Sequence, residues 1–194
     1  MEELHHLEKE KLTINIVKAN ILAVIFTIPA TLLFGLPYYL IWGSSSGRFR
    51  LNRGIASESD IFEILPFIVF FILGIILHEL IHGITWAVYA RSGFKSIRFG
   101  VLWKSLTPYC HCKEPLSVKH YITGAIMPAI ILGLIPGIIS IIIGSSDLLI
   151  LSIVFMVAGS GDFLIIYALR KEKSSDYVQD HPSEAGCYVY RHTK

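Results

Sequence analysis

The sequence predicts an all-α integral membrane protein with about four transmembrane helices and one small β-hairpin on the cytoplasmic side. Of its 194 residues, 53% are hydrophobic and 16% are charged, whereas a soluble domain is about one quarter charged. The mean hydropathy of the chain is +0.59. The uncharged residues gather in long apolar runs that can cross a hydrocarbon core of about 30 Å. A net charge of +2 is too small to favour nucleic acid as a partner.

We expect a single polytopic membrane domain over residues 1–194. Its predicted spans are approximately 17–42, 61–90, 120–144 and 148–169. Residues 1–16, in which Leu and Ile alternate with Glu and Lys, are interpreted as an amphipathic lead-in at the interface or as a solvated terminus. A loop of residues 43–60 connects the first two spans. The hairpin segment covers residues 91–119, and the polar residues 170–194 are expected to form a cytoplasmic tail.

Proline interrupts the first two predicted spans, which membrane helices tolerate. Pro29 and Pro37 lie in the first span, which ends in the aromatic residues Tyr38, Tyr39 and Trp42. Aromatic residues are enriched at the membrane interface, so these three mark the end of the span. The second span would be about 45 Å long as a continuous helix, so it must tilt or extend beyond the hydrocarbon core.

The last two spans carry breaks of their own. Pro128 and Pro136 interrupt the third span. The fourth contains Gly159-Ser160-Gly161-Asp162, in which two glycines precede an acid in mid-span. Because glycine loosens a helix, this pattern predicts a local irregularity at which the Asp162 side chain turns inward.

Residues 91–119 differ in kind from the apolar runs. The stretch from Ser96 to Val101 alternates polar and apolar residues, as a strand does. Ser105 to Pro108 has the composition of a turn, and Tyr109 to Lys113 is a second short strand. We therefore predict a β-hairpin that lies at the membrane surface.

The distribution of positive charge predicts the orientation. An even number of spans places the N-terminus, the hairpin segment and the C-terminal tail on one side of the membrane. Of the 17 lysines and arginines, Arg48, Arg50 and Arg53 lie on the other side and the remaining 14 lie on this one. Cytoplasmic loops carry an excess of Lys and Arg. We therefore predict a multi-pass cell-membrane protein with both termini in the cytoplasm.

The second span contains the pattern His-Glu-x-x-His at residues 78–82. On a helix, positions i and i+4 lie on one face about 6 Å apart. His78 and His82 can therefore bind one metal ion, and Glu79 can act as general base for a water on that ion. Ionisable residues inside a membrane span are costly, which favours a functional site at this position.

Asp162 is the candidate for the ligand that the pattern lacks, because catalytic zinc usually has three protein ligands and one water. It is the only acid in the interior of the last two spans. Asp162 precedes Arg170 by about 12 Å of helix, and His82 precedes Arg91 by about 14 Å. We therefore expect the two side chains at matching depths, where a divalent metal would compensate the carboxylate.

Other interpretations of these polar residues stay open. His78 and His82 could hydrogen-bond across helices, with Asp162 as a structural partner. Cys110-His111-Cys112 could form a metal cluster, but its i, i+2 spacing lacks a second matching pair, which favours ordinary strand residues. With Cys187 as the third cysteine, the chain has no disulfide framework. His120 and His181 are expected to be solvated.

Four stretches of the sequence together resemble a known family. They are His78 to Gly83, Cys112 to Val118, the pair Gly161-Asp162, and Asp180-His181-Pro182. Over about residues 60–190 they look like the zincin-peptidase family of four-span membrane proteins, which is similar to the site-2 proteases that cut substrates within the membrane. The resemblance implies one Zn²⁺ bound by His78, His82 and Asp162, with Glu79 as the catalytic base. Site-2 proteases usually carry Asn-Pro-Asp-Gly or Leu-Asp-Gly around the third ligand, whereas this chain has Gly-Ser-Gly-Asp-Phe.

The pattern and the resemblance predict an intramembrane zinc metallopeptidase that hydrolyses membrane-embedded or juxtamembrane peptides. The alternative is a non-hydrolytic metal-binding membrane protein, such as a divalent-ion transporter or sensor. A transporter needs a polar path on both sides of the metal, and the outer halves of spans two and four contain few polar residues. A non-catalytic membrane scaffold is the third candidate. The expected partners are the bilayer and a membrane protein or peptide substrate, of which neither the identity nor the cleavage position follows from the sequence. The oligomeric state is likewise undefined.

Overall fold

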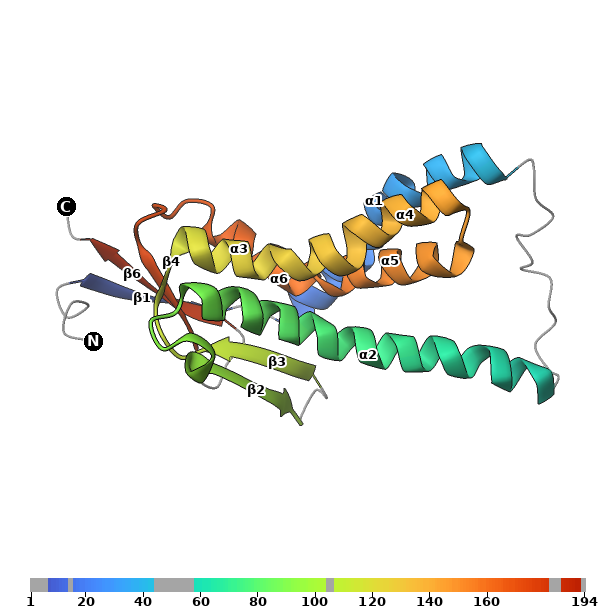
Figure 1. Cartoon of the computed structure of the whole chain (residues 1–194). Coiled ribbons are helices and arrows are strands. Elements are labelled where there is room, and N and C mark those ends of the chain that lie inside the picture. The colour runs from blue at the N-terminus through green and yellow to red at the C-terminus, as the bar shows by residue number, and fades with distance from the viewer. Residues whose placement is uncertain (1–6, 14–15, 44–57, 104–106, 182–185, 193–194) are drawn as a thin grey trace.

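The structure is a computed structural model that describes residues 7–13, 16–43, 58–103, 107–181 and 186–192. Most of these residues are helical (Figure 1). The helical elements are α1 (Ile16–Trp42), α2 (Glu58–Tyr89), α3 (Val118–Pro128), the π-helical segment η3 (Ala129–Leu134), α4 (Ile135–Ile143), α5 (Ser146–Ala158) and α6 (Ser160–Leu169). The predicted loop between the first two spans lies almost wholly in residues 44–57, outside the described residues.

Three helical stretches of the described chain are long and apolar enough to cross a membrane. They are Ile21–Trp42, Leu65–Tyr89 and Val118–Ile143, the last of which joins α3, η3 and α4. The helices α5 and α6 meet at a bend of 40°. If the bent pair is taken as one span, it is the fourth. The helices therefore fit a membrane protein with three or four spans, close to the four predicted ranges.

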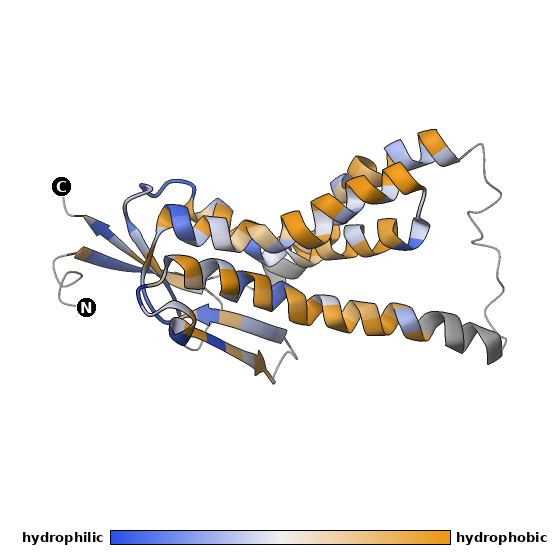
Figure 2. Ribbon diagram, viewed as in Figure 1, coloured by the Kyte–Doolittle hydropathy of each residue, from blue (hydrophilic) through white to orange (hydrophobic). Residues whose placement is uncertain are grey.

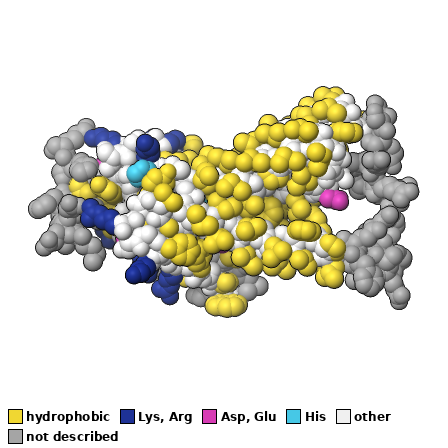
Figure 3. Space-filling view, in the orientation of Figure 1, with side chains coloured by type: hydrophobic (Ala, Val, Ile, Leu, Met, Phe, Trp, Pro, Cys, Tyr) yellow, Lys and Arg dark blue, Asp and Glu magenta, His cyan; other side chains and the backbone are white. Residues whose placement is uncertain are grey.

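Apolar side chains cover the outside of these helices. Val24, Leu40 and Ile142 are 73%, 71% and 69% exposed. Figure 2 shows hydrophobic residues along the helices, and Figure 3 shows lysine and arginine at the end of the molecule where the strands gather. Exposed apolar surface costs about 25 cal/mol per Å² in water, so faces of this extent are suited to contact with lipid.

The two breaks predicted in the last two spans are present. The fourth span bends at Gly159, which is both the C-cap of α5 and the N-cap of α6. In the third span, the π-helical turns of η3 lie between Pro128 and Pro136. Proline donates no backbone hydrogen bond, so the regular i→i−4 ladder is interrupted there.

The predicted β-hairpin between the second and third spans is also present. Strand β2 (Ile97–Leu102) pairs antiparallel with β3 (Thr107–Cys112), with Phe99 opposite Cys110. A short 3-10 helix, η2 (Gly93–Ser96), connects α2 to β2. The predicted turn begins in residues 104–106, which lie outside the described part of the chain.

The hairpin lies alongside the second half of α2 (Figure 1). A Cβ atom at Gly83 would lie 2.5 Å from the ring of Phe99, so a glycine is required for α2 and β2 to come this close. Val101 and Trp103 of the hairpin are 39% and 79% exposed. This apolar surface suits a position against lipid, although the depth of the hairpin in the bilayer stays a prediction.

A four-stranded antiparallel sheet corrects two of the sequence-based expectations. Its strand order is β1 (Leu7–Thr13), β6 (Gly186–His192), β5 (Tyr177–Asp180) and β4 (Leu116–Ser117). Residues Leu7–Thr13 are therefore a strand of this sheet rather than an interfacial lead-in or a solvated terminus, and the polar tail is folded. Local pattern does not reveal this sheet, because β1 is a charged edge strand and its partner is far away in the sequence.

This sheet brings together the three segments that positive charge placed on one side of the membrane. Strand β1 is N-terminal, β4 ends the hairpin segment, and β5 and β6 belong to the C-terminal tail. Arg191 of β6 also holds β1 and the tail, because its guanidinium pairs with Glu10 and forms two bonds of 2.7 and 2.8 Å with Glu172. The three arginines expected on the other side lie outside the described residues, and the orientation itself stays a prediction.

The polar end has a hydrophobic core between the sheet and the helix ends. Val178 and Val189 of the sheet, with Cys112, Tyr121 and Leu169, are at most 2% exposed. Tyr121 comes from α3, and Leu169 ends α6. The packing of the sheet therefore fixes the ends of the helices that carry the polar residues described next.

Candidate metal centre

Two histidine side chains of α2 point to the same place, as their i, i+4 spacing requires. The Nε2 atoms of His78 and His82 are 3.2 Å apart. Their side chains are only 12% and 4% exposed. Both lie within the stretch Leu65–Tyr89, which is apolar enough to span a membrane.

Asp162 of α6 completes a triangle with these histidines. Its Oδ2 is 3.2 Å from the Nε2 of His78, and its Oδ1 is 3.3 Å from the Nε2 of His82. Asp162 lies in the first turn of α6, directly after the bend at Gly159. The bend thus allows one carboxylate to face α2 from a helix otherwise covered with apolar residues.

The three ligand atoms have the spacing of a zinc site. Nitrogen and oxygen ligands lie about 2.0–2.1 Å from zinc, so two ligands of a tetrahedral ion are about 3.3 Å apart. The observed separations are 3.2, 3.2 and 3.3 Å. Among the described residues, His78, His82 and Asp162 are the group of histidines, cysteines and acids that could hold a metal ion. The donor set therefore fits zinc, with the fourth position left for water.

The ring of His82 is fixed by its surroundings. Its Nδ1–H donates to the backbone carbonyl of Gly124 at 2.9 Å, so the lone pair of the neutral ring is on Nε2. The ring also stacks on Trp86, with centroids 5.0 Å apart. Trp86 in turn donates through Nε1 to the carbonyl of Tyr121 at 3.0 Å. Gly124 is needed because a Cβ there would lie 2.0 Å from the Trp86 Nε1.

Glu79 lies between the hairpin and the triangle of ligand atoms from His78, His82 and Asp162. Its carboxylate is close enough to His82, His78 and Asp162 to interact with their charges. The backbone N–H of Cys110 in β3 donates a hydrogen bond to it. Glu79 is therefore held beside the three ligand atoms without being one of them, which is the place a general base would occupy.

The structure thus brings together the four residues that the sequence singled out, from two helices far apart in the chain. Their chemical roles stay predictions, because geometry alone does not test them. Cys110, His111 and Cys112 lie in β3 outside the triangle. Burial raises the pKa of the Cys112 thiol to about 11 and that of Cys187 to about 12, so both are neutral thiols at pH 7.

Two of the remaining histidines pack on aromatic rings. His120 stacks on Tyr89, with centroids 4.1 Å apart. His181 is 5% exposed and lies against Tyr188. The expectation that His181 is solvated is therefore wrong, because β5 and β6 enclose the residue that follows Asp180.

Asp180 is a buried acid near the centre that the sequence analysis did not assign. Its Oδ1 accepts from the hydroxyl of Tyr121 at 2.5 Å, and its Oδ2 accepts from the backbone N–H of Cys112 at 2.7 Å. Burial raises the pKa of Asp180 to about 6, although these two donors oppose the shift. The only signal in the sequence was the Asp180-His181-Pro182 stretch itself, which carries no recognisable spacing.

The fold and the site define a mostly helical protein, with three or four apolar stretches that could cross a membrane, and a group of side chains among them that could hold a metal ion. A family model described as "Putative zincin peptidase" matches residues 71–177, and the chain belongs to this family. Membership indicates a zinc metallopeptidase, and the matched range contains His78, Glu79, His82 and Asp162. No curated protein and no solved structure matches the chain.

Proposed function

We propose that the protein is an intramembrane zinc metallopeptidase, similar to the site-2 proteases. In this proposal His78, His82 and Asp162 bind the zinc and Glu79 is the general base. The observation that carries the proposal is the triangle of ligand atoms at 3.2 to 3.3 Å with Glu79 beside it. Its position in the apolar stretches that include Leu65–Tyr89 favours a substrate in or next to the bilayer.

The residues of the chain divide the chemical work. When bound, zinc lowers the pKa of its water to about 7 and polarises the scissile carbonyl. Glu79 accepts the proton of the attacking water and can later deliver it to the leaving amine. The N–H of Cys110 orients the Glu79 carboxylate, and the carbonyl of Gly124 orients His82. These second partners keep the reacting groups aligned before a substrate arrives.

We propose that the substrate binds as an added strand along the edge of β3 that does not pair with β2. The N–H of Lys113 bonds to Ser96 on the β2 side, so the alternating amides of Cys110 and Cys112 point the other way. Those two amides are bonded by the carboxylates of Glu79 and Asp180. The carboxylates occupy places that the carbonyls of an added strand would take. An extended substrate also presents a carbonyl that is not already hydrogen-bonded within a helix.

A paired measurement of metal and cleavage tests the proposal. The full-length protein would be purified in detergent, and its zinc content and its cleavage of membrane-derived peptides would be compared with those of Glu79→Gln. The proposal requires equal zinc in both proteins and cleavage only by the wild type. Bound zinc without cleavage in the wild type would instead favour the transporter or sensor, and absence of zinc would favour a scaffold.

A further inference from the structure

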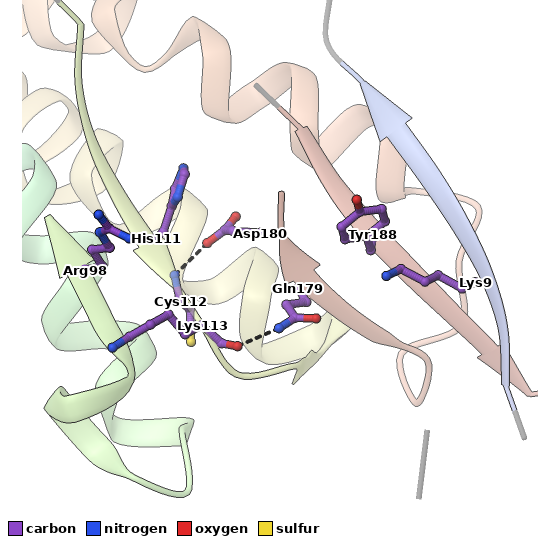
Figure 4. Close-up of a pocket in the computed structure, with 8 residues that line it drawn as sticks. All are labelled: Lys9, Arg98, His111, Cys112, Lys113, Gln179, Asp180 and Tyr188. Atoms are coloured by element: carbon purple, nitrogen blue, oxygen red, sulfur yellow. Dashed lines mark hydrogen bonds between the residues drawn. The ribbon is translucent and has the colours of Figure 1, made fainter. Parts of the chain in front are cut away.

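A cavity of about 360 Å³ lies at the polar end of the molecule, between the hairpin and the four-stranded sheet (Figure 4). One wall is formed by Arg98 of β2, by His111 of β3 and by Lys113, which directly follows β3. The facing wall is formed by Lys9 and Tyr188, from β1 and β6. The cavity therefore exists only because two separate sheets approach each other.

The lining of this cavity is strongly positive. Arg98 is opposite His111 in the hairpin register, and Lys113 is two residues further along the same face. Neither Arg98 nor Lys113 has an ion-pair partner among the residues that the structure describes. Lys9 lies with its Nζ 3.7 Å from the centre of the Tyr188 ring. Three cations thus line the cavity. Two of them, Arg98 and Lys113, are not paired with a described carboxylate.

Two other titratable residues in the lining, His111 and Asp180, are consistent with a positive electrostatic potential in the cavity. Burial, followed by the charges of Arg98 and His181, lowers the pKa of His111. Asp180 is the one acid in the lining. Both of its oxygens already accept hydrogen bonds, from Tyr121 and from Cys112. Its oxygens are thus held by the chain's own donors, and its charge offsets at most one of the three positive charges.

The cavity adjoins the edge of β3 whose backbone N–H at Cys110 bonds to the proposed base, Glu79 of α2. Cys112 lines the cavity, and Cys110, two residues earlier, donates to Glu79. Two residues of a strand span about 7 Å. A peptide that lies along β3 with its scissile bond near Glu79 would place a residue about two positions away beside Arg98 and Lys113.

We infer that this cavity is a specificity subsite that binds an acidic side chain, Asp or Glu, of the peptide substrate. The inference rests on the proposed peptidase function. Peptide is favoured over a lipid headgroup because the cavity opens beside the β3 edge and is lined by strands rather than by the apolar helices. The flanks of most membrane helices on the cytoplasmic side are rich in Lys and Arg. A positive subsite repels such flanks and so selects the minority of substrates with an acid near the membrane.

Binding of defined peptides tests the inference without cleavage. The full-length protein carrying Glu79→Gln would be titrated, in neutral detergent, with a labelled Ala/Ser peptide that contains two adjacent Glu residues. A peptide with Gln at the same positions is the matched ligand. We expect the Glu peptide to bind at least about tenfold more tightly, with an advantage that shrinks in high salt.

Charge substitutions then locate the binding. The double variant Arg98→Gln/Lys113→Gln should bind both peptides equally, while Lys171→Gln, at an exposed lysine outside the cavity, should keep the preference. Equal binding of the two peptides before substitution would overturn the inference. An equal loss from Lys171→Gln would overturn it too. The inference would also be overturned if binding to phosphatidylglycerol micelles depended on Arg98 and Lys113 while binding to the Glu peptide did not.

A cleavage measurement separates this inference from the proposed function. Wild-type protein loaded with zinc would be incubated with a mixed peptide library, and the cut sites would be found by mass spectrometry. Cleavage with no enrichment of Asp or Glu near the cut sites would overturn the subsite and leave the peptidase standing. Absence of cleavage, with the Glu peptide still bound through Arg98 and Lys113, would overturn the peptidase and leave the acid-binding cavity supported.

Discussion

The Nδ1–H of His82 donates to the carbonyl of Gly124, at 2.9 Å, across the contact between α2 and α3. This bond leaves the Nε2 lone pair of His82 free to face His78 and Asp162. It requires a glycine, because a side chain at position 124 would meet the indole of Trp86. The alignment of a proposed metal ligand thus depends on a backbone group 42 residues away.

Gly124→Ala should weaken zinc binding while the fold persists. The added Cβ would displace Trp86 and with it the stacked ring of His82, and loss of such a partner typically costs about 10–100-fold in metal affinity. Zinc affinity would be measured by competition with a chelating dye. Gly161→Ala is the matched control, because a Cβ there would meet no atom of the packed surroundings within 4 Å, the chain neighbours and the helix's own backbone aside. Equal affinity of both variants and the wild type would show that the bond does not orient His82.

Asp162→Ala should lose zinc to the same degree as His82→Ala. Each substitution removes one of three ligand atoms, and Asp162→Ala also removes the negative charge that faces the two histidines. Stoichiometry by elemental analysis of the purified variants checks this. Asp147→Ala, at an exposed acid at the start of α5, should keep full zinc. Unchanged zinc in Asp162→Ala would mean that another group is the third ligand.

Glu79→Gln should retain zinc and lose cleavage by about 10²–10⁴-fold. Glutamine keeps the size of the side chain but cannot accept the proton, and general-base catalysis contributes about this much. The rate would be measured on a peptide that the wild type cuts. Glu114→Gln, at an acid outside the centre, serves as the control. A Glu79→Gln protein as active as the wild type would remove Glu79 from the mechanism.

Asp180 should make the folded state less stable as the pH rises from about 4 to 6. Burial raises its pKa to about 6 in the folded protein, from 3.8. The folded state therefore binds more protons than the unfolded state in this window, so its stability is highest below it and falls through it. The thermal midpoint of the wild type minus that of Asp180→Asn should accordingly decrease with rising pH, by about 5 °C or more. A pH-independent difference would contradict the raised pKa.

Cys112→Pro should reduce cleavage more than it reduces zinc binding. Proline removes the Cys112 amide at the edge of β3 that does not pair with β2, together with its hydrogen bond to Asp180, without touching the three ligand atoms. The measurement is the ratio of cleavage rate to bound zinc in the variant and in the wild type. Cys112→Ala controls for the loss of the buried thiol. Full cleavage by the proline variant would exclude strand addition at this edge.

The centre was predictable from the sequence because its signals are local or depend on depth. The i, i+4 spacing places His78 and His82 on one helix face whatever surrounds them. A lone acid such as Asp162 in an apolar span is too costly to lack a partner. The hairpin likewise follows from alternation within a short segment, and the spans follow from hydropathy.

Tertiary structure alone decided the four-stranded sheet and what it buries. Strands β1 and β6 pair across nearly the whole chain: β1 is mostly charged, and the short run Cys187-Tyr188-Val189-Tyr190 of β6 does not indicate which strand it pairs with. The carboxylate of Asp180, the enclosed His181 and the cavity near Lys113 all depend on that pairing. The sequence by itself therefore determined the helices, the hairpin and the four residues of the centre, because short-range periodicity and the cost of charge in lipid specify them. The polar end and its cavity required the fold, because their contacts join segments that no local pattern connects.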